Sequence, residues 1–461
     1  MIIHNQGTDI EVLPDDSSEL VSGIMQSPAL TLHFRHPEAL TLHRGATVEF
    51  EGNTYTLLYP EQVKKIFLGY FAYDVTFHGT AEQLKLNLVK DPSEIARTSF
   101  VFSGTPREFA TLIVRSMGNG WTVGECLTTS YDKTIAFKQD SCWSAVARIA
   151  QEFATEWVVE GKTLSIRKDE RGKEDPIKMS YGKGNGFRSG VSRRGNRDKL
   201  ALSRLYVLGG NRNIDPDKYG DTLLRLPRSW QREAGKEEWR RPLRTDAAGR
   251  YIEVVGAEGA EGSVELTDIY PHRVGSVSSV LVVDAEKHFY DIVDQSIPET
   301  LDYNDYRLHG EKAVLKFQTG ALAGREFDIR QSDNALSGYI HKERRFELVP
   351  REYDGFVMPS ADWAPAPGDK YVLFGIALPN EYVTIAEGEL LAEALRTLDE
   401  QLAPQYTFEG EVDPIWAKKH WLEIGGKIVP GGHILFSDPE FHPTGERIRI
   451  TSVTQPVNNP T

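Results

Sequence analysis

Two glycine-containing runs have spacings similar to those of loops that bind phosphate groups or dinucleotides. Gly161-Lys162-Thr163 matches the end of a phosphate-binding loop, but Glu156 stands where that loop needs its first glycine. Gly182, Gly184 and Gly186 occur at every second position, without the strand-to-helix context of a dinucleotide site. We therefore expect a hairpin turn at the first run, and we expect neither run to bind a cofactor.

One group of histidines has a spacing that could suit a metal. His33, His36 and His43 could be read as zinc ligands. If they lie on strands, however, His33 and His36 point to opposite faces, and no carboxylate is placed to complete the set. Cys126 and Cys142 are too few for a thiolate site or a disulfide framework, although a single disulfide between them stays open. The sequence thus predicts no metal.

Nucleophilic and acid–base catalysis receive no better support. No Gly-x-Ser-x-Gly motif occurs, and Cys142 begins an amphipathic helix whose neighbours have the pattern of a core. A helix start can lower a thiol pKa, so a catalytic cysteine is a minor alternative. The carboxylate pairs Asp291 with Asp294 and Asp302 with Asp305 are unremarkable among 67 acidic residues. We expect no catalytic residue.

Two further groups of side chains could contact a partner. An arginine cluster could bind a phosphate or an acidic patch, but such a run is typical of a solvated linker; it comprises Arg188, Arg193, Arg194 and Arg197. Three tryptophans in loop-like surroundings could stack on sugars or anchor an interface: Trp230, Trp239 and Trp363. Each of these tryptophans could equally well be packed in a core.

The composition is that of an ordinary folded protein, with 40% apolar and 26% charged residues among 461. This length allows roughly three or four domains. The formal net charge of -14 disfavours generic affinity for DNA or anionic membranes. Because neither a run of ~18 apolar residues nor a basic apolar leader is seen, we expect synthesis and folding in the cytoplasm.

Short strands dominate residues 1–98. Apolar and polar residues alternate at 30–34 and 40–42, and a hairpin is predicted around the turn at 51–53. Further strands are expected at 70–77 and 83–89. This segment is predicted to form an N-terminal β-barrel that could recruit strands from after residue 179.

Residues 99–178 have a different pattern, that of a compact α+β module. Thr105-Pro106-Arg107-Glu108 has the form of a capping box, and the apolar residues that follow lie on one helical face up to Gly118. A strand around 134–137, a second helix capped near Asp140 or Ser141, and a hairpin at 156–166 complete the module.

The remainder is predicted to form a second β-barrel domain, 179–385, and a C-terminal α/β region, 386–461. Within the barrel, 212–262 shows little periodicity, so we expect a long irregular loop there, either an interaction loop or a local hairpin. The C-terminal region combines a helix at 389–402 with a last β segment ending at 448–453. The fold class is therefore mainly β with an α+β insert.

The order of several short motifs resembles that of tail-tip (baseplate) hub proteins of phages and prophages, of the "prophage endopeptidase tail" type. The motifs extend over about residues 30–380. They are Phe109-x-x-Leu112-Ile113, Gly120-Trp121, Thr134-Ile135-Ala136-Phe137, Asp140-Ser141-x-Trp143-x-Ala145, Glu160-Gly161-Lys162-Thr163-Leu164, Leu205-Tyr206-Val207-Leu208-Gly209-Gly210-Asn211-Arg212-Asn213, Leu224-Arg225-Leu226-Pro227, Thr267-Asp268-Ile269-Tyr270-Pro271, Gly324-Arg325-Glu326-Phe327 and Gly368-Asp369-Lys370-Tyr371-Val372-Leu373.

The resemblance implies a homotrimer in which two barrel domains of tail-tube type per subunit form a pseudo-sixfold ring. Such a hub joins the tail tube or distal tail protein to a tip, spike or receptor-binding protein, and meets the host envelope indirectly. It forms part of a conduit through which DNA passes without being bound, and an acidic lumen suits that role. The expected location is a virion tail assembled in the bacterial cytoplasm.

Two alternatives of other classes stay open. Relatives often continue into a peptidase, lysozyme or receptor-binding region, none of which we recognise before Thr461, and their naming suggests a tail-associated cell-wall hydrolase or endopeptidase. The tryptophans suggest a carbohydrate-binding surface module. We expect neither, and so no enzyme and no cofactor.

Overall fold

The computed structural model describes residues 1–67, 69–92, 96–129, 132–182, 184–195, 202–235, 241–331, 336–353, 355–402, 406–438 and 442–458. Strands predominate over helices, as the sequence predicts, and they form curled sheets with separate cores. Within the described residues, no helix is both long and apolar enough to cross a membrane.

The N-terminal strands build one curled sheet in the order β2-β1-β5-β6-β8-β4-β3-β34, with β7 paired to β8. The alternation of apolar and polar residues decides which face of this sheet is buried. In β4, for example, Leu30, Leu32 and Phe34 are buried while their neighbours are not. The strands are Ile2–Asn5 (β1), Thr8–Glu11 (β2), Glu19–Gly23 (β3), Ala29–His36 (β4), Thr47–Phe50 (β5), Asn53–Thr56 (β6), Gln62–Phe67 (β7), Tyr70–His78 (β8) and Ser452–Pro456 (β34).

The α+β module follows, and its first helix begins as the capping box predicts. Thr105 Oγ1 accepts from the amide of Glu108, whose carboxylate in turn accepts from the amide of Thr105 at 2.9 Å. The elements are Thr80–Leu86 (3-10 helix η1), Ser99–Gly104 (β9), Pro106–Met117 (α1), Thr122–Cys126 (β10), Lys133–Lys138 (β11), Cys142–Glu152 (α2), Trp157–Glu160 (β12) and Thr163–Ile166 (β13). Both helices and the predicted hairpin are confirmed.

A third group of strands packs with the long helix α4, and its core is continuous with that of the module. The sheet order is β17-β18-β19-β16-β20. The elements are Leu202–Gly209 (β16), Pro216–Tyr219 (α3), Gln231–Arg232 (β17), Leu243–Thr245 (β18), Tyr251–Val254 (β19), Ala260–Leu266 (β20) and Asn380–Leu402 (α4).

Two four-stranded sheets with their own core follow, in the orders β21-β30-β24-β25 and β22-β23-β27-β26, beside the hairpin β28-β29. The elements are Gly275–Ser276 (β21), Ser279–Asp284 (β22), Phe289–Val293 (β23), Tyr303–Tyr306 (3-10 helix η2), Val314–Phe317 (β24), Glu326–Asp328 (β25), Tyr339–Ile340 (β26), His341–Glu343 (3-10 helix η3), Arg345–Glu347 (β27), Arg351–Tyr353 (β28), Phe356–Met358 (β29) and Lys370–Phe374 (β30).

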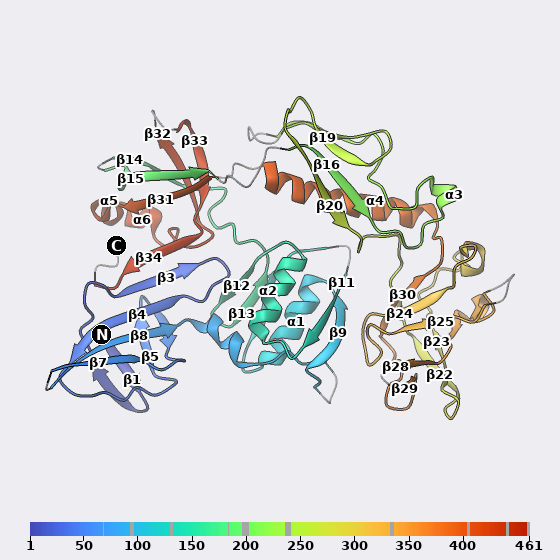
Figure 1. Cartoon of the computed structure of the whole chain (residues 1–461), viewed down its shortest axis with the longest axis horizontal. Helices are drawn as coiled ribbons and strands as arrows, with labels where there is room; N and C mark the ends of the chain where they lie inside the picture. The colour runs from blue at the N-terminus through green and yellow to red at the C-terminus, as the bar shows by residue number, and fades with distance from the viewer. Residues whose placement is uncertain are drawn as a thin grey trace.

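The last sheet combines segments far apart in the sequence, in the order β31-β15-β14-β32-β33. Its elements are Ile177–Tyr181 (β14), Gly186–Gly195 (β15), Tyr406–Val412 (β31), Pro414–Lys419 (α5), Trp421–Ile424 (α6), His433–Asp438 (β32) and His442–Arg449 (β33). Figure 1 shows this sheet and the N-terminal sheet at one end of the long axis, the module near the middle, and the sheets of 275–374 at the other end.

The structure differs from several expectations drawn from the sequence. Residues 80–86 form a 3-10 helix where a strand at 83–89 was expected, because Ala81 and Leu84, three residues apart, are both buried. The segment 212–262, expected to be irregular, contains β17 to β20, whose two- to seven-residue strands are mostly too short to show a period. The strands of 179–385, grouped above into one barrel, are distributed over several sheets, and β14 and β15 pair with strands of the C-terminal region.

Candidate functional site

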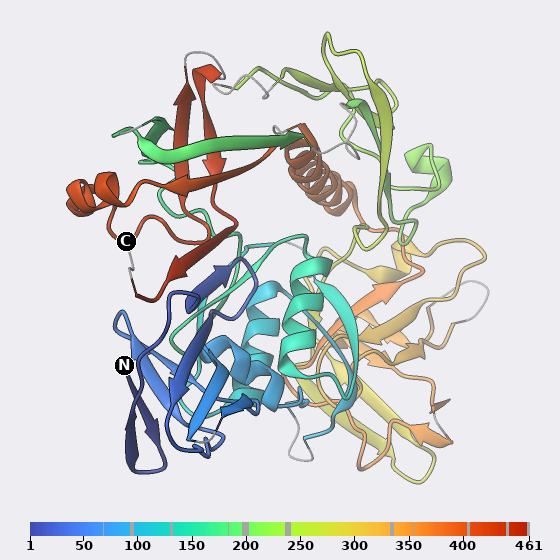
Figure 2. The ribbon, with the colours of Figure 1, turned by 60° about the vertical axis from the view of Figure 1, so that its left-hand side comes forward.

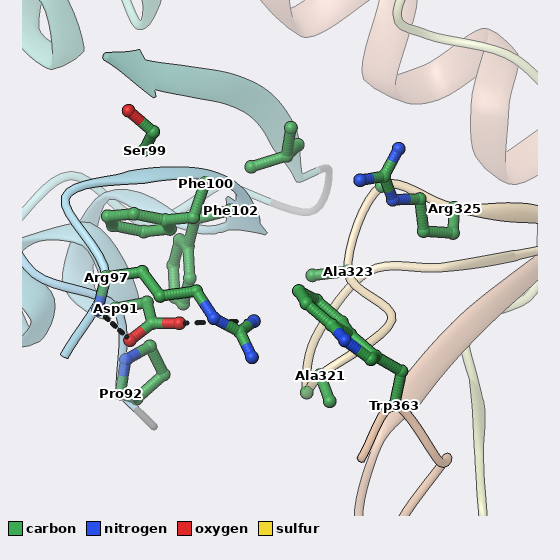
Figure 3. A pocket seen from close by; sticks show the side chains of 13 residues that line it. Asp91, Pro92, Arg97, Ser99, Phe100, Phe102, Ala321, Ala323, Arg325 and Trp363 are labelled. Carbon is green, nitrogen blue, oxygen red and sulfur yellow. Dashed lines mark hydrogen bonds and ion pairs between the residues drawn. The ribbon is translucent and has the colours of Figure 1, made fainter. Parts of the chain in front are cut away.

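A cavity of about 300 Å³ lies between the α+β module and the sheets of 275–374. Figure 3 shows it from close by: Phe100 and Phe102 of β9 face the loop at 320–325, and Trp363 closes one side. Gly324 permits this close approach, because a Cβ there would lie 2.9 Å from Val101, and its φ of +79° also favours glycine. We call this the seam cavity.

Arg97 joins the two walls of the seam cavity. Its guanidinium lies 3.7 Å from the centroid of the Trp363 ring, a cation–π contact across the seam. Its backbone amide donates to Asp91 Oδ1 at 2.9 Å, and its Nη1 lies 3.8 Å from Asp91 Oδ2. The Arg97 guanidinium and the Asp91 carboxylate therefore already have partners within the chain. The arrangement is that of a structural joint.

A second, more polar cavity of about 320 Å³ lies close by, between β11, the segment 267–270 and strands β24 and β30. Asp132 lines it, and burial together with the neighbouring Glu108 raises the pKa of that carboxyl group. Lys316 pairs with Glu326 at 3.7 Å, and Arg212 lies 4.0 Å from the centroid of the Phe374 ring. The two cationic side chains that line this second cavity, Lys316 and Arg212, therefore already have partners within the chain.

Glu108, in the first turn of helix α1, joins the α+β module to strand β30. Burial raises its pKa, but hydrogen bonds from Lys370 and from Thr105 outweigh burial, so the pKa of Glu108 lies below its ordinary value. Lys370 Nζ lies 2.5 Å from Glu108 Oε1. The helix cap and the attachment of the module to β30 therefore depend on one carboxylate.

The glycine run at 161–163 and His33 occupy structural positions. Gly161 has a φ of +58° in the turn between β12 and β13, as expected, and Lys162 Nζ donates to a backbone carbonyl, that of Asn119, at 2.9 Å. His33 Nδ1 lies 3.9 Å from a carboxylate oxygen of Asp74 on the neighbouring strand. No group of three or more His, Cys, Asp or Glu side chains that could hold a metal occurs in the described part of the chain.

The two cysteines are free thiols, so the open alternative of a disulfide between them is wrong. Cys142 begins helix α2 with its side chain fully buried. Burial raises the pKa of the Cys142 thiol to about 12, which leaves almost no thiolate at neutral pH. Its position therefore does not support a nucleophilic role.

The carboxylate pair Asp291 and Asp294 is divided between two structural networks. Asp294 is completely buried and accepts from Tyr371 Oη at 2.8 Å and Arg273 Nη1 at 3.1 Å. Burial raises its pKa, but hydrogen bonds from Ser296 and Tyr371 lower it further, so the pKa of Asp294 lies below its ordinary value. Asp291 instead accepts from Arg345 at 2.7 Å.

Asp302 and Asp305, the other candidate carboxylate pair, stand at the start of η2. Asp302 caps this 3-10 helix, accepting from the amide of Asn304 at 3.0 Å, and Asp305 lies in its first turn. A capping carboxylate is a structural feature, so this pair does not support glycoside hydrolysis.

The arginine cluster does not lie in a linker. Arg188, Arg193 and Arg194 stand on strand β15, which pairs with β31, and Arg188 Nη1 lies 3.1 Å from Glu411 Oε1. Arg197 lies outside the described residues. The expectation of a solvated linker at this position is wrong, because the partner strand comes from the C-terminal region.

Among the tryptophans, Trp230 packs against the shared core, and Trp239 lies outside the described residues. Trp363 lines the seam cavity, and its loop-like surroundings were the signal in the sequence. Arg97, Phe100 and Phe102 were missed, because nothing in their local pattern shows that they face residues more than 200 positions away.

No protein-family model and no curated protein matches the chain. Among solved structures, it is similar to the prophage tail protein gp18 of Listeria monocytogenes EGD-e (TM-score 0.36, 9% identity, 85% of this chain and 99% of that chain). It is also similar to the 43 kDa tail protein of prophage MuSo2 from Shewanella oneidensis (TM-score 0.35, 11% identity, 83% and 99%). A third similar structure is the E. coli c3393 protein, a component of the type VI secretion system (TM-score 0.31, 10% identity, 75% and 98%).

Proposed function

We propose that the chain is a structural hub at the tip of a phage or prophage tail. It would act as a homotrimer that joins the tail tube, or a distal tail protein, to the tip or receptor-binding apparatus. The observation that carries this proposal is the order of the motifs that resemble this family, several of which lie in the elements that the sequence predicted for them. Helix α1, strand β11, helix α2 and the hairpin β12-β13 follow one another in that order.

Two properties of the chain support a role in a conduit for DNA. Its net charge is -14, and an acidic surface repels phosphate groups, so that DNA would pass without binding. The chain also has curled sheets at both ends of its long axis, in residues 1–78 and 275–374, a form suited to a ring built from several copies (Figure 1).

The alternative functions receive less support from the geometry. A cell-wall hydrolase needs available carboxyl groups, whereas Asp291 and Asp294 are held by Arg345 and Arg273. A carbohydrate-binding surface needs an open aromatic face, whereas the guanidinium of Arg97 lies over the ring of Trp363. The seam cavity is therefore better explained as a joint between parts of one subunit.

The test is the mass of the purified chain in solution, measured by light scattering over a range of protein and salt concentrations. We expect a species with three times the 51.8 kDa of one chain, either throughout or on concentration, and ring-shaped particles in electron micrographs. A chain that stays monomeric at every concentration, and also when purified tail tubes are added, would contradict the proposal.

A further inference from the structure

Strand β7 is an edge strand whose side chains lack cover. Within the described residues it pairs only with β8, and all six of its residues are exposed. Val63 is 52% exposed and Phe67 is 60% exposed, and Ile66 is also open to solvent. An open strand edge with large apolar side chains is a site at which another strand adds, unless charge or cover prevents it.

Strand β22 has the same property in another sheet. It stands at the edge of the order β22-β23-β27-β26. Val282 and Val283 are 58% and 60% exposed, and Leu281 before them is also exposed. Because successive side chains of a strand point to opposite faces, consecutive exposed residues mean that both faces of this strand lack cover.

The two edges lie at opposite ends of the molecule. Figure 1, with the longest axis horizontal, shows β7 at one end and β22 at the other, and the turned view in Figure 2 keeps them apart. Neither edge can therefore cover the other within one chain. Two copies placed head to tail, in contrast, bring β7 of one against β22 of the next.

The charges of the two edges are of opposite sign. The charged residues of β7 are both cationic, Lys64 and Lys65. Strand β22 ends at Asp284, and the turn that follows carries Glu286 and Lys287. Lys287 pairs with Asp284 at 2.9 Å, so Glu286 leaves an excess of negative charge. Opposite charge at the rim of a contact increases the association rate and fixes orientation, and like charges would oppose it.

We infer that β7 of one copy pairs with β22 of a second copy, and that this strand-to-strand contact joins the subunits. The inference deepens the proposed hub and rests on it. The partner is a second copy of this chain, because one chain carries both complementary edges. A contact between two different surfaces is head-to-tail, and it closes into a ring when the rotation between copies permits.

Cysteine cross-linking tests the pairing directly. Val63→Cys and Val282→Cys are made in separate chains that carry Cys126→Ser, while the buried Cys142 is left in place. We expect mild oxidation, or a short bis-maleimide, to join the two chains when they are mixed and to join neither variant to itself. The matched control pairs Val63→Cys with Leu422→Cys, a fully exposed position on α6 that belongs to neither edge strand.

Charge reversal provides an independent readout. We expect Lys64→Glu with Lys65→Glu to weaken self-association by about tenfold or more at low salt, and adding Glu286→Lys to restore most of it. An unchanged unfolding midpoint establishes that each variant is folded. Loss of association that Glu286→Lys does not restore would count against the pairing of these two edges.

The outcomes separate the two proposals. A trimer whose Val63→Cys and Val282→Cys chains do not cross-link overturns the pairing and leaves the hub in place. Equal cross-linking in the Leu422→Cys control also overturns it. A chain that remains monomeric with and without tail tubes contradicts the pairing and the hub together, whereas cross-linking of the mixed variants alone supports both.

Discussion

Arg449 holds the C-terminal sheet on the α+β module, and its removal gives the sharpest test of how the chain is held together. Its Nη1 and Nη2 donate to the two carboxylate oxygens of Glu156 at 2.7 and 2.5 Å. Its Nε and Nη2 also donate to the carbonyl oxygen of Asp169, at 2.8 and 2.5 Å. A bidentate arginine–carboxylate pair of this kind is among the strongest side-chain contacts.

We expect Arg449→Ala to lower the free energy of opening of the C-terminal sheet by about 3 kcal/mol. This is the lower end of the range for breaking a buried pair, because both side chains keep slight contact with water. A tenfold change corresponds to about 1.4 kcal/mol, so local opening of the C-terminal sheet should become about 100-fold more frequent. Hydrogen exchange of the β32 amides, followed by mass spectrometry, measures this opening.

Lys427→Ala is the matched control. Lys427 Nζ lies 2.6 Å from Asp175 Oδ2 and joins the C-terminal region to the segment between β13 and β14, but both groups are exposed. Water screens such a pair, so exchange should stay within about twofold of the parent. Equal effects of the two variants, or unchanged exchange in Arg449→Ala, would refute the reasoning. Arg449→Lys, which keeps the charge but not the bidentate geometry, should lie between them.

Two further predictions concern single residues. Asp294→Asn should lower stability to denaturant by about 3 kcal/mol near neutral pH, because it leaves Arg273 without its buried carboxylate. The pKa of Asp294 is lowered in the folded chain, so the stability that its carboxylate adds is present above about pH 4 and is lost as the pH falls further. The stability difference between Asp294→Asn and the parent should therefore shrink in acid, and a difference that grows in acid would contradict this prediction. Gly375→Ala should lower the melting temperature more than Gly52→Ala, because its Cβ would lie 2.1 Å from the carbonyl oxygen of Lys312, whereas Gly52 faces open space at a similar φ. Equal shifts in melting temperature would mean that the positive φ alone, and not the close contact with Lys312, accounts for the loss of stability.

Local signals predicted the parts of the fold that local interactions determine. The capping box at Thr105 and the apolar face of α1 act within a few residues, and the turn at Gly161 needs only its own neighbours. Helix α4 begins at Asn380 rather than at Glu389, because Val383, Thr384 and Ile385 are β-branched and weaken the helical signal in its first turns.

Contacts between distant segments had no such signal. The pairing of β15 with β31 brings Arg188 to Glu411, and the seam cavity brings Arg97 to Trp363. In each case the two residues have unremarkable neighbours, and only the tertiary arrangement gives them a role. The sequence therefore indicated the fold class, whereas the candidate joint between the module and the sheets of 275–374 emerged from the structure.

Strand β34 completes the edge of the N-terminal sheet, and this has a consequence for synthesis on the ribosome. Gln455 Nε2 donates to Glu51 Oε1 at 2.8 Å, across 404 residues of sequence. At roughly 5–20 residues per second, translation of that stretch takes about 20–80 s. During this time the edge of β3 that later pairs with β34 has no partner strand from this chain. A nascent chain therefore carries an open strand edge for most of its time on the ribosome, and neighbouring nascent chains on one messenger RNA would meet while that edge is unpaired.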